Sequence, residues 1–373
     1  MKVLHLCKYY PPYWGGIEKV SFDLVESLNK LDCHVDVLCF NDKNKTIIEK
    51  GKYSIHRASI ISSAFSSPLS ISIFSILNKL HNKYDIIHIH LPNPMAAIAL
   101  QLINYKGIIV IHWHSDIVKQ RFLKKIYQPF QNKLLKRADK IIVTSNNYLS
   151  SSIDLKDFKN KCSIIPLGIS KEDFISNSKF NSQLKNNFKD KFVIFSLGRL
   201  IYYKGFEFLI ESARSLPDNF IILIGGTGVL KDKLQQKIDY HNLNNKVVLI
   251  GNIKYDQISE YYNIANIFCL PSIERSEAFG VVLIEAMAFG CPIVSTSIEG
   301  SGASWVNQNN ITGLKVAPKD SKALSDAFIK MSNSEILMSL YSNNSIERHN
   351  KLFKKEIMVS KTLALYNNIL NNS

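Results

Sequence analysis

The chain has 373 residues, 46% of them hydrophobic and 21% charged, which indicates about two globular domains and argues against disordered, fibrous and many-pass membrane proteins. Lys and Arg number 46 against 31 for Asp and Glu, a net charge of +15. This excess favours a polyanionic partner: nucleic acid, an anionic membrane surface or a phosphorylated substrate. The first 170 residues carry 23 basic and 12 acidic side chains, a net charge of +11, so the excess lies mainly in the N-terminal half.

Short apolar runs alternate with amphipathic stretches through the N-terminal half, a pattern typical of strand-helix-strand units and a parallel sheet. A helix is predicted over 17–31, with Val20, Leu24 and Leu28 on one face. The predicted strands are 3–7, 34–40, 86–90, 108–112, 141–144 and 163–166. The segment 170–191 is polar and lacks a clear period, so we place a domain boundary there.

The alternation resumes after this segment with strands predicted at 192–197, 220–224, 247–250, 267–270 and 293–295. The sequence therefore predicts two doubly wound α/β domains, 1–170 and 171–353, with a last helix over 354–370 that we expect to join the first domain. Such sheets bind ligands at the carboxyl ends of their strands, so two facing domains would share a cleft.

The chain lacks the marks of export. Its six cysteines form no C-x-x-C pair and lie mostly in apolar runs, which suits a reducing cytosol. The N-terminus turns polar too early for a signal peptide, and no run of about 18 apolar residues follows. We expect a cytoplasmic protein.

Gly15 and Gly16 lie between the first strand and the first helix. Glycines there let backbone N–H groups approach an anion at a helix N-terminus, although a plain turn explains them equally well. Neither a G-x-G-x-x-G nor a G-x-x-x-x-G-K-[ST] motif is present, which argues against dinucleotide dehydrogenases and P-loop NTPases.

The string HWHSD places His112, His114 and Asp116 at the carboxyl end of a predicted strand. These side chains can point into a cleft, or each histidine can be a core residue like His88 and His90. A metal site would need a further ligand cluster, which the sequence does not offer, so no metal is predicted.

Two sites are predicted in the second domain. Arg199 and Lys204, followed by Gly205, suit a diphosphate clamp, the alternative being a solvated basic loop. Glu277 and Glu285 flank a predicted helix start, one suited to a sugar and the other to a ribose. The free N–H groups of that helix start can cradle phosphate oxygens; they belong to a stretch comprising Phe279, Gly280, Val281 and Val282.

Together these residues resemble the family four retaining glycosyltransferases, which use nucleotide sugars and have the GT-B fold of two Rossmann-like domains. The resemblance covers residues 9–317 and rests on Gly15-Gly16, on R-x4-K at Arg199 and Lys204, and on E-x7-E at Glu277 and Glu285 with Phe279-Gly280 inside it. The family's active-site histidine best matches His114, with His112 as the alternative.

The resemblance implies transfer of a hexose with retention, from GDP-mannose or a UDP-sugar to a lipid-linked saccharide, as in O-antigen, capsule or lipopolysaccharide assembly. It implies that Arg199, Lys204 and the backbone around Gly280 neutralise the leaving diphosphate without a metal or other cofactor. Glu277 would then hold the sugar and Glu285 the ribose, while His114 would contact the sugar or the acceptor. No carboxylate is obviously placed as a covalent nucleophile, which favours attack on the face that the phosphate leaves.

The segment 118–140 is strongly basic, and Asp139 is its only acid. Its apolar residues recur every four positions, with an interruption at Pro129: Phe122, Ile126, Phe130 and Leu134. A core-packed helix with a solvated basic face explains this pattern. The charge density favours contact with anionic lipid headgroups or a lipid diphosphate, and the resemblance implies a polyprenyl diphosphate. We therefore expect peripheral binding to the inner face of the cytoplasmic membrane. The basic residues are Lys119, Arg121, Lys124, Lys125, Lys133, Lys136, Arg137 and Lys140.

Two other functions remain as alternatives. A nucleic-acid-binding protein would explain the charge, but the sequence has no recognition module for nucleic acid, and none is expected as a partner. A GT-B relative that epimerises or phosphorolyses sugars would use the same donor residues.

Overall fold

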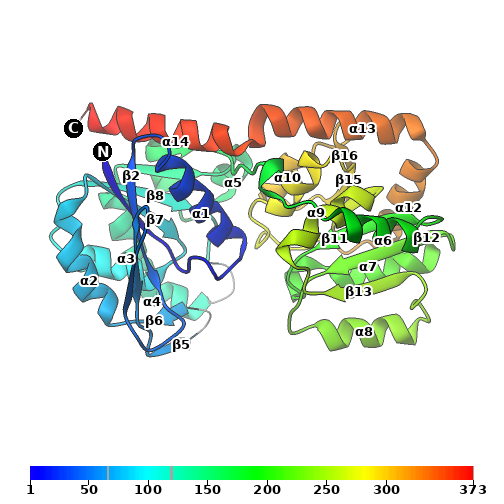
Figure 1. Cartoon of the computed structure of the whole chain (residues 1–373), viewed down its shortest axis with the longest axis horizontal. Helices are drawn as coiled ribbons and strands as arrows, with labels where there is room; N and C mark the ends of the chain where they lie inside the picture. The colour runs from blue at the N-terminus through cyan, green and yellow to red at the C-terminus, as the bar shows by residue number, and fades with distance from the viewer. Residues whose placement is uncertain (65–66, 118–120, 373) are drawn as a thin grey trace. The chain divides into compact units, whose positions relative to one another are not determined.

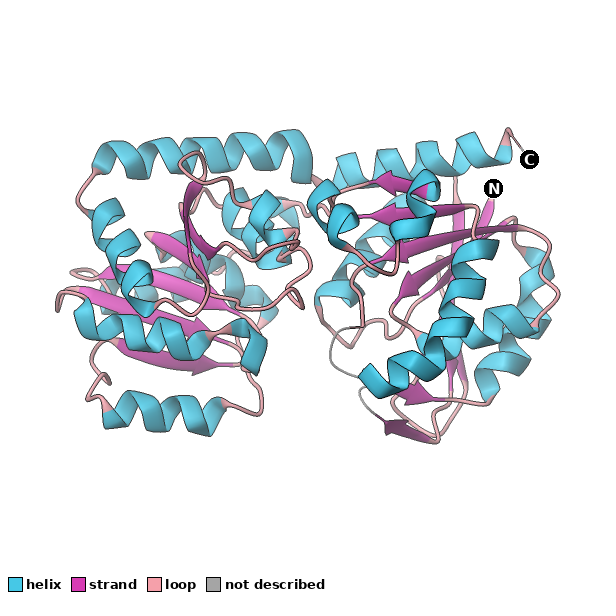
Figure 2. Ribbon diagram, turned by 180° about the vertical axis from the view of Figure 1, so that it is seen from behind, coloured by secondary structure: helices cyan, strands magenta, loops and turns pink. Residues whose placement is uncertain are grey.

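The computed structural model describes residues 1–64, 67–117 and 121–372. The chain divides into two compact units: Met1–Gly168 with Lys355–Ser373, and Ile169–Lys354. In each unit helices flank a central sheet (Figures 1 and 2). The α/β doubly wound class predicted from the sequence is confirmed, and the predicted boundary after Ser170 lies within a few residues of the observed one.

The N-terminal unit is built on an eight-stranded sheet in the order β10-β9-β8-β7-β1-β2-β4-β3, parallel throughout except for the β3–β4 pair. The central strands are buried on both faces, which explains why they read as continuous apolar runs. The strands are β1 (Lys2–Leu6), β2 (His34–Phe40), β3 (Ile47–Lys50), β4 (Ser54–Ala58), β7 (Ile86–Leu91), β8 (Ile108–Trp113), β9 (Lys140–Val143) and β10 (Cys162–Ile164), with a separate hairpin of β5 (Ser62–Ala64) and β6 (Ser67–Leu69).

The helices of this unit begin where the sequence provides caps. The Asn93 side chain accepts the Ala96 N–H at the start of α3, and the Ser145 hydroxyl accepts the Tyr148 N–H at the start of α5. The C-terminal helix packs beside α1, as its predicted place in this unit requires. The helices are α1 (Gly16–Leu28), α2 (Ser72–Leu80), α3 (Pro94–Leu102), α4 (Arg121–Arg137), α5 (Asn146–Ser151) and α14 (Lys355–Leu370).

The second unit has a six-stranded parallel sheet in the order β13-β12-β11-β14-β15-β16. Its strands are β11 (Phe192–Leu197), β12 (Phe220–Gly225), β13 (Val247–Gly251), β14 (Ile267–Leu270), β15 (Ile293–Thr296) and β16 (Gly313–Val316). Its helices are α6 (Ser178–Asn187), α7 (Phe206–Ser212), α8 (Lys231–Tyr240), α9 (Tyr255–Ile264), α10 (Val281–Ala288), α11 (Ala303–Val306), α12 (Ser321–Ser332) and α13 (Glu335–Arg348).

The strand order reverses direction at the first strand of each sheet. β1 lies between β2 and β7, and β11 lies between β12 and β14. The loops that leave the carboxyl ends of adjacent strands diverge at such a point and leave room for a ligand. Most of the predicted site residues follow these strands.

Two parts of the prediction need correction. The segment 170–191, read as aperiodic, contains helix α6, in which Leu184 is the single buried residue. Helix α4 runs through Pro129 without a break. None of the helices in the described ranges combines the length and the apolar character needed to span a bilayer.

Candidate active site

A buried ion pair lies at the carboxyl end of the second sheet. Lys204 ends the 3₁₀ turn Tyr202–Lys204 that follows β11, and its Nζ lies 2.6 Å from Glu277 Oε2. The two side chains are only 10% and 9% exposed. A Cβ at Gly198 would lie 3.2 Å from Lys204 Cε, so the glycine provides the space in which the lysine crosses the strand end.

Glu277 is held in place by its neighbours as well as by the lysine. The Ser272 hydroxyl, just after β14, donates to Glu277 Oε2 at 2.8 Å. The Ser301 hydroxyl donates to the Glu277 carbonyl oxygen. The sequence offered no role for Ser301, and the structure makes it a support for the glutamate. No side-chain partner of Glu277 Oε1 is found among the described residues, so that oxygen can accept a further hydrogen bond.

Gly205 allows the two loops of this site to approach each other. Its φ is +67°, in the left-handed region, and a Cβ there would lie 2.1 Å from the Pro271 carbonyl oxygen. Only glycine fits both constraints without strain. The lysine loop and the glutamate loop therefore depend on this residue for their relative position.

Helix α10 begins beside the glutamate. Gly280 is its N-cap with φ +79°, and Val281 and Val282 form its first turn, as predicted. Their backbone N–H groups have no carbonyl one turn earlier to bind and carry the positive end of the helix dipole. The Phe279 ring is buried beside Phe353 and Trp305. The backbone of this stretch is therefore available to a phosphate, as predicted, but the ring of Phe279 is not.

The remaining predicted residues of this unit differ in exposure. Glu285 lies on α10, and its Oε2 accepts the Tyr262 hydroxyl at 2.7 Å. Burial and this carboxylate raise the pKa of Tyr262 well above its usual value. Arg199 follows β11 and is exposed, with no side-chain partner among the described residues, so it is available to an anionic ligand.

In the N-terminal unit Gly15 and Gly16 are exposed at the start of α1, where Gly15 is the extended N-cap. A Cβ at Gly15 would lie 2.4 Å from Glu18 Oε2. The Glu18 carboxylate thus already lies near this end of the helix, and its negative charge would repel an anion bound there.

Five histidines occupy one face of the three neighbouring strands β1, β7 and β8. His5 is paired in register with His88, and His90 with His112. The His112 and His114 rings stack at 4.2 Å between centroids with an interplanar angle of 9°. Four of these residues were recognised from the sequence, and His5 was not. Spacing identifies only the pairs 88/90 and 112/114, because residues two apart on a strand share a face. His5 is the single histidine of β1, and it joins the group through the pairing of β1 with β7.

Burial keeps these histidines neutral. Desolvation lowers the pKa of His5 and of His114 to about 3, and lowers those of His88, His90 and His112 well below 6.5. His112 is fully buried, and neither of its ring nitrogens has a partner in the described part of the chain. His114 keeps 5% of its surface exposed, so it is the more accessible histidine of the HWHSD string.

Asp116 organises the turn that follows β8. Its Oδ1 accepts the Trp113 Nε1–H at 2.9 Å and the Ser152 hydroxyl at 2.8 Å, and its backbone N–H donates to the Tyr148 hydroxyl. These bonds fix the end of the strand that carries His114.

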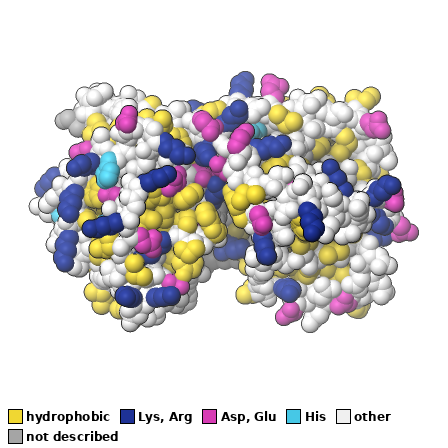
Figure 3. Space-filling view, viewed as in Figure 1, with side chains coloured by type: hydrophobic (Ala, Val, Ile, Leu, Met, Phe, Trp, Pro, Cys, Tyr) yellow, Lys and Arg dark blue, Asp and Glu magenta, His cyan; other side chains and the backbone are white. Residues whose placement is uncertain are grey.

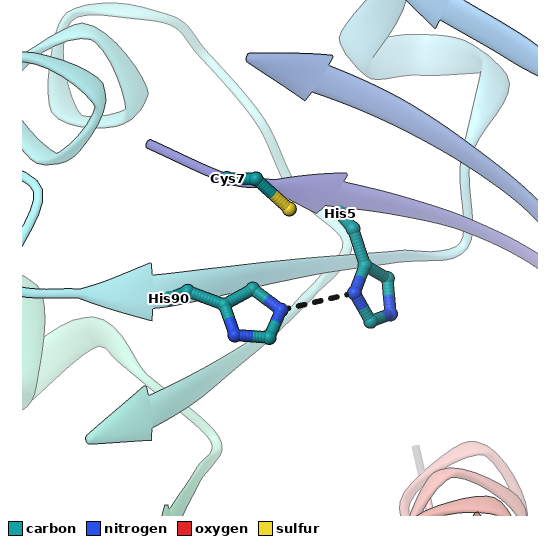
Figure 4. A group of neighbouring side chains, drawn as sticks. All are labelled: His5, Cys7 and His90. Carbon is teal, nitrogen blue, oxygen red and sulfur yellow. Dashed lines mark hydrogen bonds between the residues drawn. The ribbon is translucent and has the colours of Figure 1, made fainter. Parts of the chain in front are cut away.

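Two groups of side chains in this unit bring metal-ligand atoms within 4.8 Å of one another: His5, Cys7 and His90, and His88, His90 and His112. In the second group the rings lie within 7° to 27° of parallel, so their in-plane lone pairs do not converge on one ion. In the first group His5 Nδ1 and His90 Nε2 already form a hydrogen bond of 3.1 Å (Figure 4).

The matches to known proteins extend over both units. Residues 14–173 match the model described as Glycosyltransferase Family 4, and residues 177–348 match Glycosyl transferases group 1. The chain is 32% identical over 378 residues to O-antigen chain mannosyltransferase C of Escherichia coli, covering all of both chains. It is 31% identical to D-rhamnosyltransferase WbpZ of Pseudomonas aeruginosa, over 88% of this chain and 85% of the relative.

Solved structures share the fold. Sucrose-phosphate synthase from Thermosynechococcus elongatus matches with a TM-score of 0.82 and 21% identity, covering all of both chains. HepE of Anabaena in complex with UDP matches with a TM-score of 0.81 and 20% identity, over 99% of this chain and all of that one.

Proposed function

The chain belongs to the group 1 glycosyltransferases and has their GT-B fold of two Rossmann-like domains; from this premise we propose that it moves a hexose from a GDP-sugar to a lipid-linked saccharide. The observation that carries the proposal is the buried pair of Lys204 and Glu277 at the carboxyl ends of β11 and β14. Two relatives above 30% identity are named for mannose and D-rhamnose. D-Rhamnose is 6-deoxymannose, so we propose GDP-mannose as the donor.

The donor diphosphate is assigned to the cationic side of this site. Lys204 Nζ, the exposed Arg199 and the first-turn N–H groups of α10 supply positive charge from three elements. Negative charge accumulates on the diphosphate as the sugar leaves, and donors fixed in advance stabilise that charge in the transition state. These groups carry the charge without a metal, and activity should therefore persist in a chelator.

The sugar and the ribose are assigned to the two glutamates. Glu277 Oε2 is occupied by Lys204 and Ser272, and Oε1 remains to accept hydroxyl groups of the sugar. Glu285, fixed by the Tyr262 hydroxyl, would accept the hydroxyl groups of the ribose.

We propose that the reaction retains the configuration at the anomeric carbon, because the acceptor attacks the face from which the phosphate leaves. The bond between the anomeric carbon and the β-phosphate oxygen breaks, and a bond from that carbon to the acceptor oxygen forms on the same face. The acceptor proton passes to the departing phosphate oxygen, so no protein base or nucleophile is required. His114 would hydrogen-bond the sugar or the acceptor.

The acceptor is proposed to reach the enzyme at a membrane surface. Helix α4 exposes Ile126 (57%) and Phe130 (42%) beside the exposed Lys125 and Lys133, while Leu134 is fully buried. Apolar side chains flanked by lysines on a helix surface suit insertion among anionic headgroups. Lys119 lies outside the described residues, as do the side chains of Arg121 and Phe122.

The basic residues are not confined to this helix. Lys and Arg side chains are visible over both units on the face drawn in Figure 3. We therefore propose α4 as the contact with anionic lipid because its exposed apolar residues accompany the charge, and charge alone would not single it out. On this proposal the enzyme acts at the inner face of the cytoplasmic membrane, in O-antigen or related polysaccharide assembly.

The proposal is tested with GDP-mannose, UDP-glucose and UDP-N-acetylglucosamine, each incubated with the protein in the presence and absence of a polyprenyl-diphosphate saccharide. We expect GDP release from GDP-mannose that depends on the acceptor. The one-bond carbon–proton coupling at the new anomeric centre then reports retention. Epimerisation without acceptor, or phosphate-dependent release of sugar phosphate, would establish one of the alternative activities instead.

A further inference from the structure

A line of hydrogen bonds joins His114 to the C-terminal helix α14 across the buried face of the first sheet. His114 Nε2 lies 2.9 Å from His90 Nδ1, and His90 Nε2 lies 3.1 Å from His5 Nδ1. His5 Nε2 lies 3.2 Å from the Tyr366 hydroxyl, which also bonds His88 Nδ1. The line thus ends at His88 on one side and at His114 on the other.

The tautomers of these side chains depend on one another. A neutral imidazole has one N–H donor and one lone pair, and a tyrosine has one O–H. Each contact in the line needs one donor and one acceptor, and the Tyr366 oxygen could also accept from both of its histidines. That arrangement would leave the fully buried Tyr366 O–H without an acceptor among the described residues. Two arrangements remain: all donors point toward His88, or all point toward His114.

Burial favours the second arrangement. If the donors pointed toward His88, its proton would lie on Nε2, which is buried and has no partner among the described residues. Orphaned buried N–H groups are rarer than unpartnered acceptors in folded proteins. In the other direction His88 donates through Nδ1 to Tyr366, and Nε2 keeps only a lone pair. The far end has no such restriction, because His114 keeps 5% of its surface exposed and its Nδ1 is not one of the buried side-chain atoms that lack a partner in the described part of the chain.

We propose that this line fixes the proton of His114 on Nδ1, so that His114 meets the substrate as a hydrogen-bond donor and not as a base, with His90 and Tyr366 as its positioning residues. The substrate contact rests on the proposed function, while the tautomer does not. A donor at this place agrees with a reaction in which the departing phosphate oxygen takes the acceptor proton, because a histidine protonated on Nδ1 and bonded through Nε2 has no lone pair to accept it.

Cys7 provides the competing arrangement. Its sulfur, His5 Nδ1 and His90 Nε2 lie within 4.8 Å of one another (Figure 4). A Zn²⁺ ion held by these atoms would take the place of the proton between the two rings and interrupt the line. The same experiment separates the two arrangements.

The test is a long-range proton–nitrogen NMR spectrum of the full chain labelled with ¹⁵N-histidine, with His114 assigned through the His114→Gln variant. We expect protonated Nδ1 and unprotonated Nε2 for His114 in the free protein. His90→Phe removes the Nδ1–H group that His114 Nε2 accepts and should move proton occupancy toward His114 Nε2, with kcat lowered about tenfold or more and KM for the donor little changed. His349→Phe, at a buried histidine of the other unit, is the matched control and should change neither.

A wild-type spectrum with the proton of His114 on Nε2 overturns the proposal, as does an unchanged tautomer in a folded His90→Phe protein. Stoichiometric zinc that shifts the His5 and His90 signals and is lost in Cys7→Ser also overturns it. The wild-type spectrum needs neither turnover nor the variant. A wrong donor assignment would abolish the kinetic result with GDP-mannose and leave the tautomer in place, so the two failures can be told apart.

Discussion

Lys204 Nζ lies 2.6 Å from Glu277 Oε2, and this contact joins the loop after β11 to the loop after β14. Both side chains are largely removed from water, where an unpaired charge is costly. The pair therefore stabilises the arrangement of these two loops. A variant that removes one charge leaves the other without its partner.

Glu277→Gln keeps the shape of the side chain and removes its charge. We expect kcat/KM to fall by about 100-fold or more, because the amide is a weaker acceptor for sugar hydroxyls and leaves Lys204 unpaired. The unfolding free energy should fall by about 3 kcal/mol. Steady-state kinetics and urea unfolding check both values. Glu347→Gln, at an exposed carboxylate of α13, is the control, and equal behaviour of the two variants would remove Glu277 from the site.

Gly205→Ala tests the close approach of the two loops. The added Cβ would lie 2.1 Å from the Pro271 carbonyl oxygen at a φ of +67°, so the backbone must move. We expect a loss of more than about 1 kcal/mol in unfolding free energy, together with reduced activity. Gly251→Ala shares a positive φ but has nothing within 4 Å of the new Cβ, so it reports the cost of the backbone conformation alone. Equal destabilisation by both variants would show that the clash has no effect.

Acid should destabilise the N-terminal unit. Burial lowers the pKa of His5 and His114 to about 3 from the usual 6.5, so between these values the unfolded chain binds protons that the folded chain does not. The stabilisation is complete above pH 6.5 and is lost as the pH falls toward 3, by about 1.4 kcal/mol per pH unit for each such histidine. Urea unfolding at about pH 7.5 and about pH 5 measures this slope. His114→Gln should flatten it while His34→Gln, at an exposed histidine, should not, and a slope that both variants share would contradict the prediction.

Membrane binding should depend on α4. Lys125→Ala with Lys133→Ala removes two exposed charges, which at about 1 kcal/mol each predicts roughly thirtyfold weaker binding to anionic vesicles. Vesicle sedimentation measures the effect. Lys50→Ala with Lys52→Ala removes the same charge from an exposed part of the same unit. An equal loss in both double variants would assign the binding to net charge and not to α4.

The sequence predicted most of the buried strands, because a strand covered on both faces reads as an unbroken apolar run. β3 was missed since its residues are half-buried or exposed, and α6 because Leu184 alone marks its buried side. Helix α10 was found because its glycine start and apolar body are local features of the chain.

The sequence predicted which residues follow the strand ends, but not how they pair. Lys204 and Glu277 are 73 positions apart, and their contact depends on β11 and β14 being neighbours in the sheet. The line from His114 to Tyr366 needs β1, β7, β8 and the C-terminal helix to be placed together. Such contacts follow from strand order, which local periodicity does not determine.

Lys204 is proposed to stabilise the departing diphosphate, and the kinetics of Lys204→Ala with GDP-mannose and the lipid-linked acceptor test this role most directly. Removing one preorganised donor to the developing charge should lower kcat/KM by about 10² to 10³-fold, with the loss mainly in kcat. Lys322→Ala, at an exposed lysine of α12, should match the wild type. A folded Lys204→Ala protein with near wild-type kcat/KM would contradict the claim.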